Sequence, residues 1–442
     1  MPTGTSRQAR GVRSGFGRLL AASTITNIGD GMSAIAYPWL ASALTRHPLL
    51  IALVAVAQRL PWLVLSLPAG VITDRVDRRR LIVRMDIIRG AVTTAVAFAV
   101  LARSAVLPAP GAVVDGAGTD VVLYIVLLSA TLMLGSAEVL RDNSAQTLMP
   151  SIVDGPDLER SNGRLWAAES AANQFIGPPL GSLLIGIAFT LPFLIDSVTF
   201  FVAAGLVATI PGTFKPVSNG EEQRPWREDL RDGIRWLRSH SVLWPMAIVL
   251  GIMNGSGALA EATLVIFAQE VLEAGPFLFA VIGAGGAIGS ILGGWAVPKI
   301  SRKLGGGTVL AIAVAGLGAC SFTVAIATHW VIVMIAFSLT AMLGLGWNVV
   351  TVSLRQSVIP NHLLGRVNSV YRFMAWGSIP IGAMLGGVLV SLLDGPFDRQ
   401  TALRAPWLVS ALIHVGILVI VLRRLNTAAL DAIRPGGPID AD

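Results

Sequence analysis

Residues Gly70 to Arg80 read GVITDRVDRRR and lie between two long apolar segments that carry almost no charge. This short stretch holds two acids and four arginines. Because such a density of charge must lie in water, the stretch predicts a short loop between two membrane spans. Short basic loops remain on the cytoplasmic side of a membrane, so the stretch also predicts which side this loop faces.

The composition of the whole chain is that of a polytopic membrane protein. Of 442 residues, 54% are hydrophobic and 13% are charged, and the mean hydropathy is +0.70. The net charge of +7 is explained by cytoplasmic loops beside anionic lipid, so it does not indicate a nucleic-acid partner. Cys320 is the single cysteine; it excludes a disulfide framework or a thiolate metal site and predicts core packing.

Apolar segments of about 20 residues predict twelve membrane spans. The first follows a basic N-terminal stretch and is too long for a signal peptide, so we expect it to remain uncleaved. The expected spans are 17–42, 49–72, 81–103, 121–147, 165–188, 190–211, 243–270, 277–298, 307–328, 331–357, 367–393 and 405–424.

The distribution of arginine and lysine sets the orientation. Of 33 such residues, 24 fall in the two tails and the loops on the same side as Gly70 to Arg80. Four fall in the opposite loops, and five lie in or near spans. The positive-inside rule therefore predicts that both termini are cytoplasmic, in a multi-pass protein of a bacterial plasma (inner) membrane.

Residues 212–242 interrupt the apolar pattern and divide the spans six and six. We expect a cytoplasmic N-tail at 1–16, a six-helix bundle at 17–211, this linker, a second six-helix bundle at 243–424 and a cytoplasmic C-tail at 425–442. Within the linker, Trp226, Leu230, Ile234 and Leu237 recur at helical spacing, with arginines on another face. This pattern predicts an amphipathic helix at the membrane surface; a docking helix for a calmodulin-like partner is the alternative.

The two halves also repeat each other. QTLMP (146–150) after the fourth span is matched by QSVIP (356–360) after the tenth. The fifth span carries Gly177, Gly181 and Ser182, and the eleventh carries glycines in the corresponding order at 382, 386 and 387. The order and direction of these matches predict a parallel repeat of six spans, and thus two pseudo-symmetric six-helix bundles in an all-α membrane protein.

Ionisable side chains inside a bilayer are costly, so each one needs a partner or a function. Asp30 lies midway along the first span and Arg59 at a comparable depth in the second. Glu138 lies in the fourth span and Glu261 in the seventh. We treat these four as candidate proton or substrate residues. The alternatives are static ion pairs, such as Asp30 with Arg59, or groups beside the wall of a wet cavity.

Other charged residues of the spans lie nearer their cytoplasmic ends, where gating pairs or simple solvation suffice; they are Asp86, Arg89, Arg141, Asp142 and Glu169. The five histidines show no metal-ligand spacing, and no phosphate-binding loop is present. The sequence therefore predicts no enzyme, no metal site and no cofactor.

These features together resemble the major facilitator superfamily. GVITDRVDRRR is similar to its loop motif through Gly70, Asp74, Arg75, Arg78 and Arg79. GPPLGS in the fifth span resembles the antiporter motif through Gly177, Pro178 and Gly181, with Ser182 in place of a glycine. NIGDG in the first span, the QRLPWLVLSLPAG run, AEVLRDNSAQTLMP and GRVNSVYRF resemble the branch of drug, macrolide and siderophore exporters.

The resemblance implies a cytoplasmic gate as well as a fold. In this superfamily the loop aspartate lies against the start of the eleventh span, and a loop arginine pairs with an acid of the fourth. Carried over, this places Asp74 near 364–368, a segment that includes Arg366, and Arg78 near Asp142 or Glu138.

The resemblance and the membrane carboxylates together predict a proton-coupled exporter of amphipathic or lipophilic small molecules that works by alternating access. Its expected partners are the small-molecule substrate, protons and membrane lipids, and we expect a monomer. Export of one endogenous metabolite, such as a siderophore, is an alternative. An ion-independent lipid or amphiphile flippase is another; a sensor would need a soluble output domain, which the sequence lacks.

Overall fold

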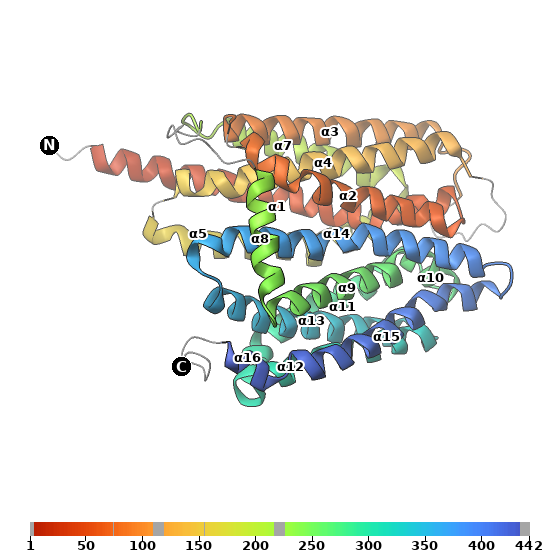
Figure 1. Cartoon of the computed structure of the whole chain (residues 1–442). Helices are drawn as coiled ribbons and strands as arrows, with labels where there is room; N and C mark the ends of the chain where they lie inside the picture. Colours follow the sequence, from red (N-terminus) through yellow and green to blue (C-terminus); the bar gives the residue numbers. More distant parts are fainter. Residues whose placement is uncertain (1–3, 74, 109–118, 154, 216–225, 434–442) are drawn as a thin grey trace. The chain divides into compact units, whose positions relative to one another are not determined.

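The computed structural model describes residues 4–73, 75–108, 119–153, 155–215 and 226–433. Nearly all of these residues are helical (Figure 1). The helices up to the middle of the chain are α1 (Gly4–Leu44), α2 (Pro48–Thr73), α3 (Arg78–Ala102), α4 (Val121–Ile152), α5 (Leu158–Ala171), the π-helical turn η2 (Ala172–Ile176), α6 (Gly177–Ile187) and α7 (Thr190–Ala208).

The second half of the chain continues in the same way. Its helices are α8 (Trp226–Ser239), α9 (Leu243–Glu261), α10 (Leu264–Glu270), α11 (Pro276–Leu304), α12 (Gly306–Ile326), α13 (Trp330–Val358), α14 (Asn361–Leu393), α15 (Arg399–Arg424) and α16 (Thr427–Ala432).

Ten helical segments of the described chain are long and apolar enough to cross a membrane. The prediction of an all-α membrane protein is thus confirmed, while the count of twelve stays a prediction. The two expected spans outside the ten, 17–42 and 165–188, are nevertheless helical, in α1 and in α5, η2 and α6. Both carry polar side chains, including Asp30 and Glu169, that lower their apolar character.

Several helices extend beyond the expected spans because polar residues continue their helical pattern. α1 begins at Gly4 rather than near 17, and α4 continues to Ile152 rather than 147. The segment expected as one span at 243–270 is broken at Ala262 and Thr263 between α9 and α10. These differences concern ends and breaks rather than the identity of the helices.

The chain forms two compact units. The first comprises residues 1–46, 57–221 and 275–280, and the second comprises 47–56, 222–274 and 281–442. In the first unit α1 packs against α6 and α7, and α3 packs against α4 and α7. In the second, α9 packs against α14, and α12 packs against α13 and α15.

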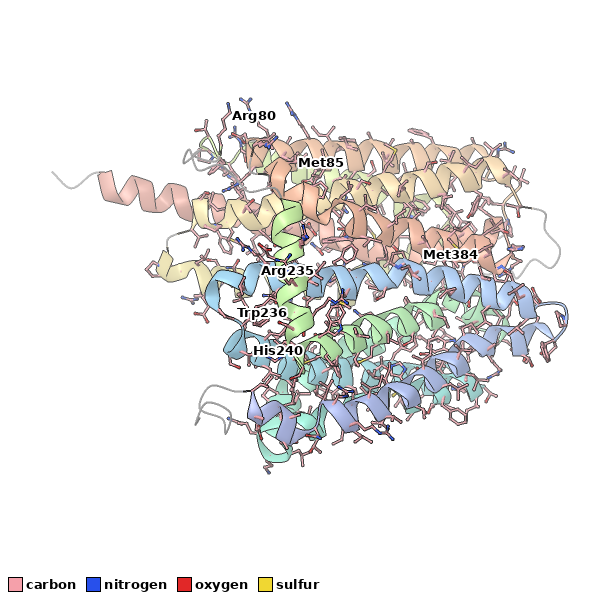
Figure 2. The ribbon with its side chains drawn as sticks, viewed as in Figure 1. Arg80, Met85, Arg235, Trp236, His240 and Met384 are labelled. Atoms are coloured by element: carbon pink, nitrogen blue, oxygen red, sulfur yellow. The ribbon has the colours of Figure 1, made fainter. Side chains whose placement is uncertain are left out.

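The amphipathic helix α8 belongs to the second unit, where it packs on α14 and α9. Leu237 is fully buried in the apolar core of this unit, and Ile234 and Trp236 pack against that core. Figure 2 shows Arg235, Trp236 and His240 on and just after this helix. A Cβ at Gly233 would lie 2.9 Å from the Arg366 carbonyl oxygen of α14, so the two helices touch closely. The apolar face of α8 therefore covers protein, where we expected lipid.

Glycines set the closest helix crossings in both units. A Cβ at Gly177 would lie 2.6 Å from the Gly31 Cα, and one at Gly181 would lie 2.7 Å from the Met32 carbonyl oxygen. In the second unit a Cβ at Gly382 would lie 2.0 Å from the Gly255 carbonyl oxygen. In each unit the glycine-bearing helix thus contacts the helix that opens that half of the spans, as a parallel repeat requires.

Candidate functional site: a charged cavity in the first unit

The first unit encloses a cavity of about 210 Å³ between its membrane-spanning helices. Five helices and the π-helical turn contribute side chains to its wall. They are Asp30, Ser33, Ala34 and Tyr37 of α1, Gln58 and Arg59 of α2, Arg89 of α3, Thr131, Leu134, Gly135 and Glu138 of α4, Asn173 of η2, and Asp196 and Phe200 of α7.

Asp30 reaches the cavity because two glycines bring α1 close to its neighbours. A Cβ at Gly29 would lie 1.9 Å from Asp196 Oδ1 of α7, and a Cβ at Gly31 would lie 2.5 Å from the Asn173 carbonyl oxygen of η2. Neither contact leaves room for a side chain. The NIGDG sequence therefore packs α1 tightly on both sides, while the side chain of Asp30 lines the space between.

The π-helical turn η2 continues directly into Gly177, the first glycine of the antiporter-type motif. Single turns of π-helix often occur at functional sites, where they displace side chains from regular helical register. Here the turn places Asn173 in the cavity wall. Pro178 follows as the second residue of α6, where it has no amide hydrogen to donate to the preceding helical turn.

Arg89 is the cation at the centre of the charged groups. Its side chain is 3% exposed and forms an ion pair with Asp30. Its guanidinium carbon lies 4.1 Å from the centroid of the Phe200 ring, a cation–π arrangement. Glu138 and Asp196 add negative charge around the same guanidinium. A buried arginine with these partners is held in one place.

Two of the four candidate residues, Asp30 and Arg59, are therefore not partners of each other. The partner of Asp30 is Arg89, not Arg59, although Arg59 lines the same cavity. Arg89 was expected near a span end, where solvation suffices, but it lies deep in α3 and is buried. In the sequence, the dense charge at the start of α3 makes the single Arg89 further along this helix easy to overlook.

Glu138 lines the cavity, whereas Glu261 does not. Glu261 is the last residue of α9 in the second unit and is exposed. The structure therefore brings Asp30, Arg59 and Glu138 together and leaves Glu261 apart.

Asp196 is the site residue that the sequence reasoning missed. Its carboxylate is buried in α7, accepts a hydrogen bond of 2.7 Å from the Ser33 hydroxyl, and lies 3.2 Å from the Thr199 hydroxyl. The signal was available, because Asp196 is a lone acid in an otherwise apolar span, FLIDSVTF. The rule that singled out Asp30 also applies to it.

A second buried cluster of charged side chains surrounds Arg141 in the first unit. Arg141 Nε donates to Asp86 Oδ1 at 3.3 Å, and its terminal nitrogens donate to Asp142 and to the hydroxyls of Ser23 and Thr26. Asp86 is fully buried, so simple solvation does not explain it. This cluster joins α1, α3 and α4 and is a fixed internal network.

The structure describes only part of the cytoplasmic gate that the family resemblance implies. Asp74 lies outside the described residues. Gly70 lies in the last turn of α2, with open space where a Cβ would stand. Arg78 donates to the Thr147 carbonyl oxygen of α4 at 2.9 Å, and Arg79 donates to the Ile210 carbonyl oxygen. Arg75 is exposed.

The two remaining gate candidates have partners in their own units. Asp142 accepts from Arg141 of the buried cluster, and Arg78 donates to a backbone carbonyl of the same helix, α4. In the second unit Arg366 of α14 lies 3.8 Å from Asp232 of α8.

Asp77 fastens the charged loop within the first unit. Its carboxylate accepts hydrogen bonds from the Arg80 amide at 3.0 Å and from the Phe214 amide at 3.2 Å. Burial alone would raise the pKa of Asp77, but these two amides and the neighbouring arginines hold it below its usual value. The side chain thus caps α3 and ties it to the segment after α7.

An all-helical chain with many membrane spans and a charged cavity is typical of a membrane transporter. Comparison with known proteins specifies the class. The chain matches the family described as "Transmembrane secretion effector" over residues 11–434, and it belongs to that family of the major facilitator superfamily.

Relatives and solved structures agree with this assignment. The chain is 26% identical over 439 residues to the multidrug efflux pump Tap of Mycobacterium tuberculosis, covering 95% of this chain and 97% of that one. It is 24% identical over 429 residues to Tap of Mycolicibacterium fortuitum, covering 92% and 95%. The nucleoside transporter NupG has the same fold, with a TM-score of 0.70 at 12% identity over 92% of this chain and 99% of NupG.

Proposed function

We propose that this protein is a proton-coupled exporter of amphipathic or lipophilic small molecules in a bacterial plasma membrane, with both termini cytoplasmic. The observation that carries the proposal is the cavity of the first unit, with three carboxylates and two arginines among membrane-spanning helices. Groups of this kind inside a membrane mark ion and substrate pathways. Export is supported by the relatives named as multidrug efflux pumps.

The chemistry of the cavity wall supports a proton gradient as the energy source. Carboxylates shielded from water can exchange a proton for a substrate, and a proton gradient can then drive the exchange. Alternating access would expose the cavity first to one side of the membrane and then to the other. The working partners are the substrate, protons and surrounding lipid, and we propose that the monomer is the working form.

Transport in everted membrane vesicles tests the proposal. Vesicles that contain the protein should accumulate a fluorescent lipophilic dye when respiration acidifies their interior, and nigericin, which collapses the pH gradient, should abolish the accumulation. Vesicles from the same host without the protein are the control. Dye uptake that persists without any gradient would reject proton coupling and favour an ion-independent flippase.

A further inference from the structure

The three carboxylates of the cavity differ in the chemistry of their partners. Asp30 is ion-paired with the buried Arg89 guanidinium. Glu138 has no hydrogen bond or ion pair among the described residues of the unit. Among the described residues, Asp196 accepts hydrogen bonds from the hydroxyl groups of Ser33 and Thr199, while the charges of Asp30 and Arg89 act on it without a direct bond. Because a proton must bind and leave repeatedly, the partner that each carboxylate would keep after protonation decides which of them carries it.

Protonation of Asp30 would break its strongest interaction. A guanidinium group has donors but no acceptor, so it gains nothing from a neutral carboxylic acid. Arg89 is nearly inaccessible to water and would then be a buried cation without its ion-pair partner, which is strongly unfavourable. Asp30 therefore keeps its charge as long as Arg89 stays beside it.

Asp196 keeps its hydrogen bonds in both protonation states. A hydroxyl group both donates and accepts, so Ser33 can donate to the carboxylate and accept from the carboxylic acid. Thr199 donates its hydrogen to the Asp196 carbonyl oxygen at 2.7 Å. The same hydroxyl also donates to Asp196 Oδ1 at 3.2 Å. Because a hydroxyl group can turn from donor to acceptor, this contact too can be kept when the carboxyl group carries a proton.

The backbone of α1 is shaped to accept this carboxyl group. The position of a Cβ at Gly29 lies 1.9 Å from Asp196 Oδ1 and 2.5 Å from Thr199 Oγ1. Only the missing side chain at Gly29 lets the Asp196 carboxyl group lie against α1, one residue from Asp30. The two aspartates thus occupy neighbouring positions with different direct partners, a guanidinium at Asp30 and hydroxyl groups at Asp196.

We propose that Asp196 binds and releases the coupling proton, with Ser33 and Thr199 as its hydroxyl partners, while Asp30 stays ionised beside Arg89. This inference rests on the proposed function and names the residue that would carry its coupling proton. The charged or titratable groups that share the cavity with Asp196 are Asp30 and Tyr37 of α1, Arg59 of α2, Arg89 of α3 and Glu138 of α4.

The same chemistry specifies a class of substrate. With Asp196 ionised, the cavity holds three carboxylates against two arginines and carries an excess negative charge. Either a proton on Asp196 or a lipophilic cation in the cavity neutralises that excess. A proton and a cationic amphiphile therefore compete for the cavity, which is the exchange that an antiporter needs.

Proton release on binding of a probe cation tests the inference. Purified protein in weakly buffered detergent solution should release about one proton when saturated with tetraphenylphosphonium. The Asp196→Asn variant, which copies the protonated side chain in shape, should release none and bind the probe with an affinity that no longer depends on pH. The matched variant Glu159→Gln, at an exposed carboxylate of α5 that does not line the cavity, should release the proton as the wild type does.

Two further measurements keep the test valid if Asp196→Asn folds poorly. Infrared spectra of the wild type should contain a carboxylic-acid C=O band at neutral pH that disappears when the probe binds. In Thr199→Val, which keeps the shape of the side chain, the loss of the hydrogen bond that the hydroxyl donates to the carboxylate should raise the pH midpoint of probe binding by about 0.5 to 1 unit. A midpoint equal to that of the wild type would show that the titrating group is not beside Thr199 and would overturn the inference.

The outcomes separate this inference from the proposed function. Loss of proton release in Glu138→Gln and its retention in Asp196→Asn would assign the proton to Glu138 and overturn the inference, while gradient-driven dye transport would still stand. Absence of pH-dependent probe binding in the wild type would overturn it as well. Wild-type vesicles that fail to accumulate dye under a proton gradient would overturn the proposed function itself.

Discussion

The crossing of α1 and α6 provides the sharpest test of the packing. In Gly177→Ala the new Cβ would lie 2.6 Å from both the Gly31 Cα and the Ile28 carbonyl oxygen, whereas ordinary contact begins at 3.4 Å. Both obstacles are backbone atoms, so no side chain can rotate away, and the helices must separate locally by about 0.8 Å. Overpacking of this kind costs about 1–3 kcal/mol.

The matched control lies on the same helix. A Cβ at Gly186 would meet nothing within 4 Å, so Gly186→Ala should leave stability unchanged or raise it by up to about 1 kcal/mol through the better helix propensity of alanine. Thermal unfolding in detergent, followed by tryptophan fluorescence, measures both variants. At about 2–4 °C per kcal/mol for a domain of this size, Gly177→Ala should unfold roughly 2–12 °C below the wild type. Equal Tm values for the two variants would refute the close crossing.

Three further predictions concern charge, pH and the linker helix. Arg89→Gln should destabilise the protein by about 3–5 kcal/mol because it leaves Asp30 as an unpaired, mostly buried charge; adding Asp30→Asn should recover much of the lost Tm, and an additive double variant would contradict the pair. Asp77→Ala should lower stability by about 0.5–2 kcal/mol, and Asp77→Asn should retain most of it. Because the pKa of folded Asp77 is lowered, its ionised form contributes stability above the unfolded pKa of about 3.9, and that contribution falls away as pH decreases through the lower folded value. The Tm difference between wild type and Asp77→Ala should therefore be constant from about pH 6 to 8 and shrink in strongly acidic solution. Leu237→Ala should cost about 2–5 kcal/mol because Leu237 is fully buried, whereas Arg235→Ala, at a side chain that is 69% exposed, should change little; equal effects would place α8 at the lipid surface instead.

The sequence predicts the helices well because membrane spans leave a strong local signal. An uninterrupted apolar segment has few alternatives to a helix in a bilayer. The packing of α8 was harder to foresee. An amphipathic pattern states only that one face avoids water, and it does not state whether lipid or protein covers that face; Leu237 and Gly233 are buried against protein.

The sequence could not predict which charged residues pair with each other in the cavity, for a related reason. The depth of a residue in its span can be counted, but the rotation of each helix about its axis cannot, because most spans are apolar around their whole circumference. Arg59 and Arg89 are both deep arginines, and only the rotation of α3 brings Arg89 to Asp30. Asp196 stands out in the sequence as a lone acid in an apolar span, but only the packing of Gly29 against it shows that it faces α1.

The two glycines of NIGDG connect packing with function. Gly31 and Gly177 hold α1 against α6 and the π-helical turn, while Gly29 receives the Asp196 carboxyl group. Any movement that separates α1 from α7 would remove Asp196 from Ser33 and expose it to whatever fills the cavity. A helix rearrangement during transport would therefore change the proton affinity of Asp196 directly, and release of the proton would in turn favour the rearranged packing, since linkage between the two is reciprocal. The glycine crossing that the antiporter-type motif provides and the acid that we assign to the proton thus lie on opposite sides of one helix, with Asp30 and its fixed charge between them.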